Sequence, residues 1–176
     1  NGDYVWSYKT GYFVDSAIAY FEGVVFVASE DSNVYALNAS NGEQIWSYGT
    51  DEMIMLSSPI IAYGMVYVGS VDDKVYALNA STGKQVWSYK TDDDVVSTPA
   101  VADGVVYIGS DDDKLYALDA FTGNPIWNYT TGGPVFSGPA VNQGIVYAGS
   151  VDGNLYALDT TDGTVLWNYL TGGVIA

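Results

Sequence analysis

The side chains best suited to chemistry in this sequence are carboxylates, which recur in short acidic runs. Calcium prefers oxygen ligands, and runs of this kind can supply them. The candidate ligands are one Asp from the equivalent turn of each of the four repeats: Asp31, Asp72, Asp112 and Asp152. None of these runs has the ligand spacing of an EF-hand loop, and Asp is also favoured in turns for backbone reasons alone. A calcium site and a plain set of acidic turns therefore stay open as alternatives.

Other catalytic chemistry is restricted by the residue types that the sequence lacks. It contains no His, Cys or Arg, which excludes Ser-His-Asp and Cys-His nucleophiles and imidazole or thiolate metal sites. Glycosidase-type catalysis needs two carboxyl groups about 5 to 10 Å apart in a cleft, and the sequence marks out no such pair. We therefore predict no catalytic residues and no cofactor, with calcium as the one candidate ion.

The charge balance restricts the partners. Against 21 acidic residues the sequence has five lysines, for a net charge of −16. Nucleic acids and anionic membranes attract clustered positive charge, so we predict that the protein binds neither. No run approaches the 18 consecutive apolar residues typical of a membrane-spanning helix, which predicts no membrane insertion.

Several columns of residues recur with one period of about 40 residues. Tryptophans occur at intervals of 40, 41, 40 and 40 residues, at Trp6, Trp46, Trp87, Trp127 and Trp167. A glycine column keeps the same interval, at Gly42, Gly83, Gly123 and Gly163, and we expect these glycines to have a left-handed backbone. Independent columns with one period indicate a structural repeat.

Each repeat is predicted to form four β-strands. In the third copy, residues 97–102, 105–110, 114–118 and 125–129 are predicted strands separated by turn residues such as Asp103-Gly104. In the fourth copy, Asp152-Gly153 is a signal for a two-residue hairpin.

Four antiparallel strands per 40 residues are typical of a propeller blade, whereas β-helical solenoids have shorter repeats. We predict an all-β fold, a β-propeller in one domain over residues 1–176. Its blades are predicted at about 12–50, 51–91, 92–131 and 132–171, with an additional outer strand at 4–9.

The repeat resembles that of the quinoprotein, or PQQ-like, β-propellers, whose tryptophan-docking motif is Ala-x-Asp-x-x-x-Gly-x-x-x-Trp. The third copy contains it as Ala117, Asp119, Gly123 and Trp127, and two other copies have Asn in place of Asp. The resemblance covers nearly the whole chain. It implies that each tryptophan packs on the neighbouring blade and that Ala and Gly leave room for it. The Asn replacements indicate that this position needs a hydrogen-bond acceptor more than a charge.

Enzymes of this family hold pyrroloquinoline quinone and calcium in a central channel, and the resemblance implies an Arg near the quinone, an Asp base and often a vicinal disulfide. This chain lacks Arg and Cys, so we predict that it is not an enzyme. Other members are non-enzymatic and scaffold envelope assembly. The prediction is an extracytoplasmic or cell-surface interaction module, and the alternative is a piece of a quinone-dependent dehydrogenase or a sugar-binding propeller.

Three sequons for N-glycosylation begin at Asn38, Asn79 and Asn128. Together with the absence of Cys and the acidic composition, they are compatible with a secreted or cell-surface protein.

The sequence starts and stops within a repeat. An open array of blades would expose an apolar face at each end. Three outcomes stay open: a piece of a longer propeller, two chains that close one ring, or a filament. We expect a protein partner and self-association through the open blade ends.

Overall fold

The computed structural model describes residues 2–176 as sixteen β-strands in four separate four-stranded sheets. Blade 1 contains β1 (Ala19–Phe21), β2 (Val24–Ser29), β3 (Asn33–Asn38) and β4 (Gln44–Gly49). Blade 2 contains β5 (Ile60–Ala62), β6 (Met65–Ser70), β7 (Lys74–Asn79) and β8 (Gln85–Lys90). Blade 3 contains β9 (Ala100–Ala102), β10 (Val105–Gly109), β11 (Lys114–Asp119) and β12 (Pro125–Thr130). Blade 4 contains β13 (Ala140–Asn142), β14 (Ile145–Gly149), β15 (Asn154–Asp159) and β16 (Val165–Leu170).

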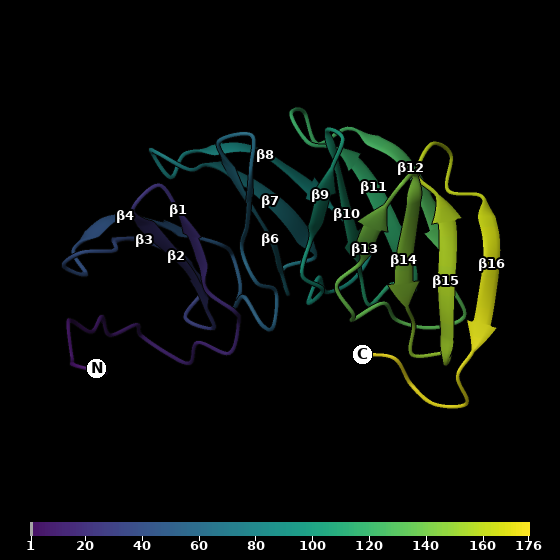
Figure 1. The fold of residues 1–176 in the computed structure, drawn as a ribbon, viewed down its shortest axis with the longest axis horizontal. Helices are drawn as coiled ribbons and strands as arrows, with labels where there is room; N and C mark the ends of the chain where they lie inside the picture. Colours follow the sequence, from purple (N-terminus) through teal and green to yellow (C-terminus); the bar gives the residue numbers. More distant parts are fainter. Residues whose placement is uncertain (1) are drawn as a thin grey trace.

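Every blade is an antiparallel meander in which sequence neighbours are also spatial neighbours. The short inner strands of consecutive blades contact one another in the order β1, β5, β9 and β13, and the sheets follow one another along an arc (Figure 1). This arrangement confirms the all-β propeller prediction and excludes a solenoid. The domain and blade boundaries stay predictions.

The core lies between blades because the middle strands are covered on both faces. All six residues of β6 are buried, which explains why its sequence is continuously apolar instead of alternating. Three clusters of buried side chains fill the three spaces between consecutive blades. A blade therefore completes its core only when another apolar surface lies on each of its faces.

Two-residue turns join the first and second strands of each blade. In the turn Asp103-Gly104 both residues have positive φ, 50° and 78°, as in the type I′ turn that matches the twist of a hairpin. The predicted turn at this position is thus confirmed. The equivalent turns are Glu22-Gly23, Tyr63-Gly64 and Gln143-Gly144.

The two-residue hairpin predicted at Asp152-Gly153 is wrong. Three residues, 151–153, separate Ser150 and Asn154, whose backbone groups are joined by an N–H to carbonyl bond of 3.1 Å. Gly153 has a φ of 85° and donates its N–H to the Ser150 carbonyl at 3.0 Å. A positive-φ residue at the third position is the usual way to close a three-residue hairpin loop.

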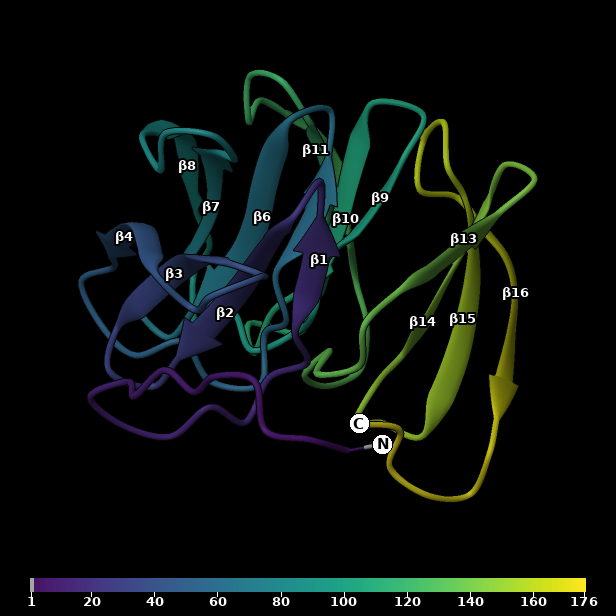
Figure 2. The ribbon, with the colours of Figure 1, turned by 60° about the vertical axis from the view of Figure 1, so that its left-hand side comes forward.

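The additional outer strand predicted at 4–9 is also wrong. These residues belong to the described part of the chain and are assigned to no strand. The physical reason is that a strand needs a hydrogen-bonded neighbour, and among the described residues no third strand of the same blade lies beside this segment. It instead runs as an extended segment alongside blade 1 in both views (Figures 1 and 2).

Candidate interaction site

A tryptophan from the outer strand of one blade lies on a glycine of the next blade. The Trp87 indole covers Gly123 so closely that a Cβ atom built on this glycine would lie 2.7 Å from the ring. The indole N–H donates to the Ala120 carbonyl at 2.9 Å. The same pair of contacts joins Trp46 to blade 2 and Trp127 to blade 4. These contacts hold consecutive blades face to face.

The sequence around each of these glycines builds the surface on which the indole lies. Gly123 has a φ of 72°, so a side chain there would be strained as well as obstructed. The Asp119 carboxylate accepts N–H groups of Phe121 and Thr122 at 3.0 and 2.8 Å, and Asn79 uses its amide oxygen in the same way in blade 2. The geometry agrees with a need for an acceptor at this position, which both Asp and Asn provide.

Trp167 occupies the same position in blade 4 but no blade follows it within the described residues. It is 44% exposed, whereas Trp87 is 7% exposed. Its ring still lies 5.9 Å from Tyr147 at 48°, close to the 5.8 Å and 46° between Tyr107 and Trp127. Trp167 thus already has the conformation of a docked tryptophan. We call the surface formed by Tyr147, Trp167 and Tyr169 the end face.

The opposite end of the array is covered by the N-terminal segment. Trp6 lies 2.6 Å from a Cβ atom built on Gly42 and donates its indole N–H to the Ala39 carbonyl at 2.9 Å. Tyr8 packs 5.4 Å from Tyr35. Trp6 therefore docks on blade 1 although the rest of a preceding blade is absent from the described residues.

The four candidate calcium ligands lie one in each blade and do not converge. Asp72 accepts the Tyr76 hydroxyl at 2.6 Å and the Asp51 backbone N–H at 3.0 Å, and its three equivalents also accept a tyrosine hydroxyl. Burial alone would raise the pKa of Asp152, but hydrogen bonds from Tyr156 and backbone N–H groups lower it. Within residues 2–176 the one group of three carboxylates with close oxygens is Asp73, Asp93 and Asp94, none of them a candidate. Calcium binding stays a prediction.

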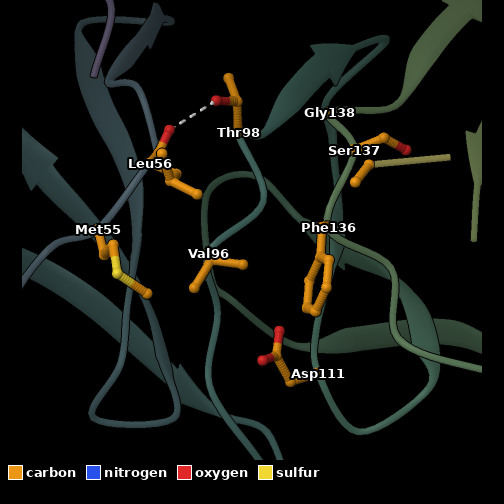
Figure 3. A pocket seen from close by; sticks show the side chains of 9 residues that line it. Met55, Leu56, Val96, Thr98, Asp111, Phe136, Ser137 and Gly138 are labelled. Atoms are coloured by element: carbon orange, nitrogen blue, oxygen red, sulfur yellow. Dashed lines mark hydrogen bonds between the residues drawn. The ribbon is translucent and has the colours of Figure 1, made fainter. Parts of the chain in front are cut away.

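A cavity of about 460 Å³ lies between the loops that enter blades 2, 3 and 4 (Figure 3). Its lining is largely apolar, with Met55, Val96 and Phe136, and the Asp111 side chain points into it. Burial, and then the nearby Asp94, raises the pKa of Asp111 to about 6. Within the described residues, Oδ1 of Asp111 is buried without a hydrogen-bond partner.

Sequence reasoning treated Asp111 only as part of an acidic turn. The repeat contains the signal that was missed, because the equivalent residues in blades 2 and 4 are Val71 and Val151, although blade 1 has Glu30. A charged residue at a position that two of the other three copies fill with valine indicates an uncompensated carboxylate.

The predicted glycosylation sites lie in two settings. Asn38 and Asn79 are half-buried at the ends of β3 and β7, and each amide oxygen caps the following turn. Asn128 is exposed on β12. Use of the three sequons stays a prediction.

Four blades joined by tryptophan-on-glycine contacts define a β-propeller of the PQQ-like repeat class. A family model described as outer membrane protein assembly factor BamB matches residues 1–98 and 92–175. The chain belongs to this family. Among curated proteins, no sequence matches it.

Solved structures share the fold at low sequence identity. BamB from Moraxella catarrhalis has a TM-score of 0.82 at 23% identity, over 93% of this chain and 55% of that one. The quinohemoprotein alcohol dehydrogenase ADHIIG from Pseudomonas putida HK5 has a TM-score of 0.82 at 21% identity, over 95% and 36% of the two chains. The computationally designed Ika4 protein has a TM-score of 0.81 at 16% identity, over 90% and 99%.

The chain thus spans about half of the length of the Moraxella protein and about a third of the length of the dehydrogenase. The fold is common to an assembly factor, an enzyme and a designed protein, so the fold alone does not determine a function. In the described part of the chain, no helix is long and apolar enough to cross a membrane.

Proposed function

We propose that this chain is a non-enzymatic protein-binding module of an extracytoplasmic assembly, and that it binds its partner through the end face. The observation that carries the proposal is the contrast between Trp167 at 44% and Trp87 at 7% exposure. Both residues belong to the same column of the repeat and have the same ring geometry with the tyrosine beside them. Within the described residues, a surface that forms core between the other blades is therefore uncovered on blade 4.

The free energy available at this surface follows from the exposed area. A tryptophan buries up to about 250 Å², so reducing the exposure of Trp167 from 44% to the 7% of Trp87 would remove roughly 90 Å² from water. At about 25 cal/mol per Å² this is ~2 kcal/mol from a single side chain. Tyr169, at 65% exposure, adds to the same surface. Aromatic anchors of this kind dominate protein interfaces.

The chemistry of the end face favours a protein as its occupant. In the interior blades each indole N–H donates to a backbone carbonyl of the neighbouring blade. The Trp167 indole has no acceptor among the described residues, so an occupant that supplies a backbone carbonyl beside a small residue would complete the contact. The family description, an outer membrane protein assembly factor, supports an extracytoplasmic location and a protein partner.

For the dehydrogenase alternative, we compare the lining of the cavity beside Asp111 with the groups that the quinone cofactor needs. Pyrroloquinoline quinone is an anionic tricarboxylate, and a site for it needs cationic or donor groups. The lining offers the hydroxyl groups of Thr98 and Ser137 but no cationic side chain that could balance three carboxylates, and the Asp111 carboxylate would repel them. The sequence has no Arg or His. The residues present do not fit the cofactor, and we derive no catalytic step from it.

Site-specific photo-crosslinking tests the proposed function. A photoreactive phenylalanine analogue replaces Trp167 in one variant and Leu166 in another. Leu166 is 49% exposed. The equivalent residues of the three preceding blades, Ile45, Val86 and Ile126, are 49%, 49% and 47% exposed although a blade follows each of them, so this position lies outside the contact between blades. We expect a discrete protein crosslink in the producing cells from position 167 and not from 166. Equal crosslinking at both positions, or none at 167, would refute the proposal.

Absorption spectra provide the second measurement. After incubation with pyrroloquinoline quinone and calcium and removal of free cofactor, we expect no bound chromophore. A stoichiometric quinone absorption would restore the enzyme alternative.

A further inference from the structure

The cavity beside Asp111 lies among the loops that enter blades 2, 3 and 4 and shares no residue with the end face (Figure 3). Asp111 belongs to the turn between β10 and β11 of blade 3, and this blade packs on blade 2 on one face and on blade 4 on the other. The cavity volume of about 460 Å³ falls within the range of sites that hold small organic molecules. The chemistry of its lining determines which molecules it favours.

The Asp111 carboxylate is the uncommitted polar group of this lining. Its Oδ1 is buried without a hydrogen-bond partner among the described residues. The two lining hydroxyl groups already bond to the chain, since Thr98 accepts the Ser58 N–H at 3.0 Å and Ser137 accepts the Gly149 N–H at 3.0 Å. A carboxylate turns readily about its last torsion, so either oxygen can face the cavity. A ligand that brings a hydrogen-bond donor to this carboxylate would remove the cost of the unpaired oxygen.

The electrostatic surroundings of Asp111 favour a positively charged ligand. Asp94 and Asp93 from the loop before β9, and Asp112 from its own turn, all repel its charge. Within the part of the chain that the structure describes, the ion pairs of the lysines do not include Asp111. A cation would relieve this repulsion, whereas an anion would increase it.

The remaining lining favours an organic cation over a metal ion. Val96 and Met55 contribute hydrocarbon and a thioether, and the side chains of Phe136 and Asp111 point into the same space (Figure 3). Aromatic rings attract organic cations, whereas Ca²⁺ needs six to eight oxygen ligands and this lining has a single side-chain carboxylate. An ammonium group on an apolar body therefore matches the lining.

The repeat shows that the fold does not need a carboxylate at this position. The Asp111 backbone N–H donates to the Asp94 carbonyl at 2.9 Å, and the other blades have the same backbone bond. The equivalent pairs are Glu30 with Phe13 in blade 1, Val71 with Met53 in blade 2 and Val151 with Pro134 in blade 4. Blades 2 and 4 thus form this bond between apolar residues, where blade 3 has two carboxylates. Backbone structure alone does not explain the charge at the cavity.

We propose that this cavity binds a small organic ammonium ion. Its charged group would donate hydrogen bonds to the Asp111 carboxylate, and its apolar body would lie against Phe136 and Val96. The inference is independent of the proposed function, because the cavity and the end face are separate surfaces. The net charge of −16 attracts cations to the whole protein, so the test separates a site from this general attraction.

Isothermal titration calorimetry at about pH 7.5, with roughly 0.15 M salt to screen the general attraction, tests the proposal. The probe is 2-phenylethylammonium, and we expect one site per chain. Methylammonium has the charge without the body and 2-phenylethanol has the body without the charge, so each is expected to bind at least about tenfold more weakly. Asp111→Asn is expected to weaken binding of the probe by at least about tenfold, because a hydrogen bond to a charged group is lost. The matched control is Asp103→Asn, which removes the same charge from an exposed turn of blade 3 and is expected to leave the affinity unchanged.

The pH dependence gives an independent readout. The pKa of Asp111 is raised to about 6, so at about pH 4.5 most molecules carry a protonated Asp111 and the affinity is expected to fall by roughly tenfold or more. Asp93, Asp94 and Asp112 also act on this carboxylate. The pH series is therefore repeated with Asp111→Asn, whose residual binding is expected to change little.

Circular dichroism establishes that each variant is folded. Asp111→Val, which introduces the residue of blades 2 and 4, replaces Asp111→Asn if that variant does not fold. The proposal is overturned if the probe does not bind, if it binds equally to Asp111→Asn, or if Asp103→Asn loses as much affinity. Binding of 2-phenylethanol as tight as that of the probe would also overturn it, because the carboxylate would then contribute nothing.

Discussion

Trp87→Ala and Trp167→Ala make a matched pair of substitutions, because they remove the same side chain from the same column of the repeat. Trp87 is enclosed between blades 2 and 3, where its indole N–H donates to the Ala120 carbonyl at 2.9 Å. Trp167 lies on the open end of blade 4. The two variants therefore differ mainly in whether a following blade is present.

The difference in free energy of unfolding can be worked from the structure. Replacing a buried tryptophan by alanine costs about 3 to 5 kcal/mol. The Ala120 carbonyl keeps a second donor, the Tyr67 hydroxyl at 3.1 Å, so Trp87→Ala leaves no orphaned acceptor. Trp167→Ala removes a side chain with roughly 90 Å² less buried area than Trp87, a difference worth ~2 kcal/mol. It also breaks no indole hydrogen bond, whereas Trp87→Ala breaks one worth ~1 kcal/mol. We expect Trp87→Ala to be more destabilising by about 2 to 3 kcal/mol.

Thermal unfolding of both variants measures this difference. For a chain of this size, 1 kcal/mol corresponds to about 2 to 4 °C in Tm, so Trp87→Ala is expected to melt at least about 4 °C below Trp167→Ala. Urea unfolding gives an independent value for the same two proteins. Equal losses in the two variants would refute the docking interpretation, because the following blade would then contribute nothing to the tryptophan.

Three further predictions concern a glycine, a carboxylate and a phenol. Gly83→Ala is expected to lower Tm more than Gly64→Ala, since both glycines have positive φ but only the Cβ of the first would contact an indole, at 2.6 Å; equal losses would contradict the packing argument. The pKa of Asp111 is raised to about 6 from 3.8, so its charge destabilises the fold above about pH 6 and the penalty disappears as pH falls toward about 4. Asp111→Asn is accordingly expected to raise Tm at about pH 8, with a gain that shrinks toward about pH 4; a gain independent of pH would disprove this assignment. Burial, and then the carboxylate of Asp72, raises the pKa of Tyr76, so Tyr76→Phe is expected to leave the alkaline absorption titration of the folded protein unchanged until it unfolds; a lost step in the range of exposed tyrosines would refute this.

Local sequence signals predicted most of the strands because each repeat contains them independently. The apolar run 105–110 predicted the central strand β10, and Asp103-Gly104 predicted the turn before it, which is of type I′. The first strand was predicted too long, at 97–102, whereas β9 begins at Ala100. Residues 97–99 lie in the connecting loop, and the buried Ser97 hydroxyl donates to the Ser137 carbonyl of the next blade at 3.0 Å. A contact with the next blade is not visible in a local pattern.

The candidate site was less accessible to sequence reasoning. The tryptophan and glycine columns identified residues that meet, and the resemblance supplied which blade each tryptophan faces. The sequence indicated four candidate calcium ligands. The structure places these four Asp residues in separate blades, where each accepts a hydrogen bond from a tyrosine hydroxyl. Asp111 was overlooked because its burial depends on loops from three blades.

The sequence by itself determined the repeat, the four strands of each blade and the residues of the docking contact, because these depend on turns and on apolar patterns within about 40 residues. Only the tertiary structure decided which copies of the contact are complete. Trp87 and Trp167 occupy the same column of the repeat and each is followed by a Tyr two residues later, yet one is buried and the other is exposed, since burial requires a neighbouring blade and not a local conformation. For the same reason residues 4–8 dock like an outer strand without forming one: their side chains contact blade 1, but among the described residues no strand lies beside their backbone.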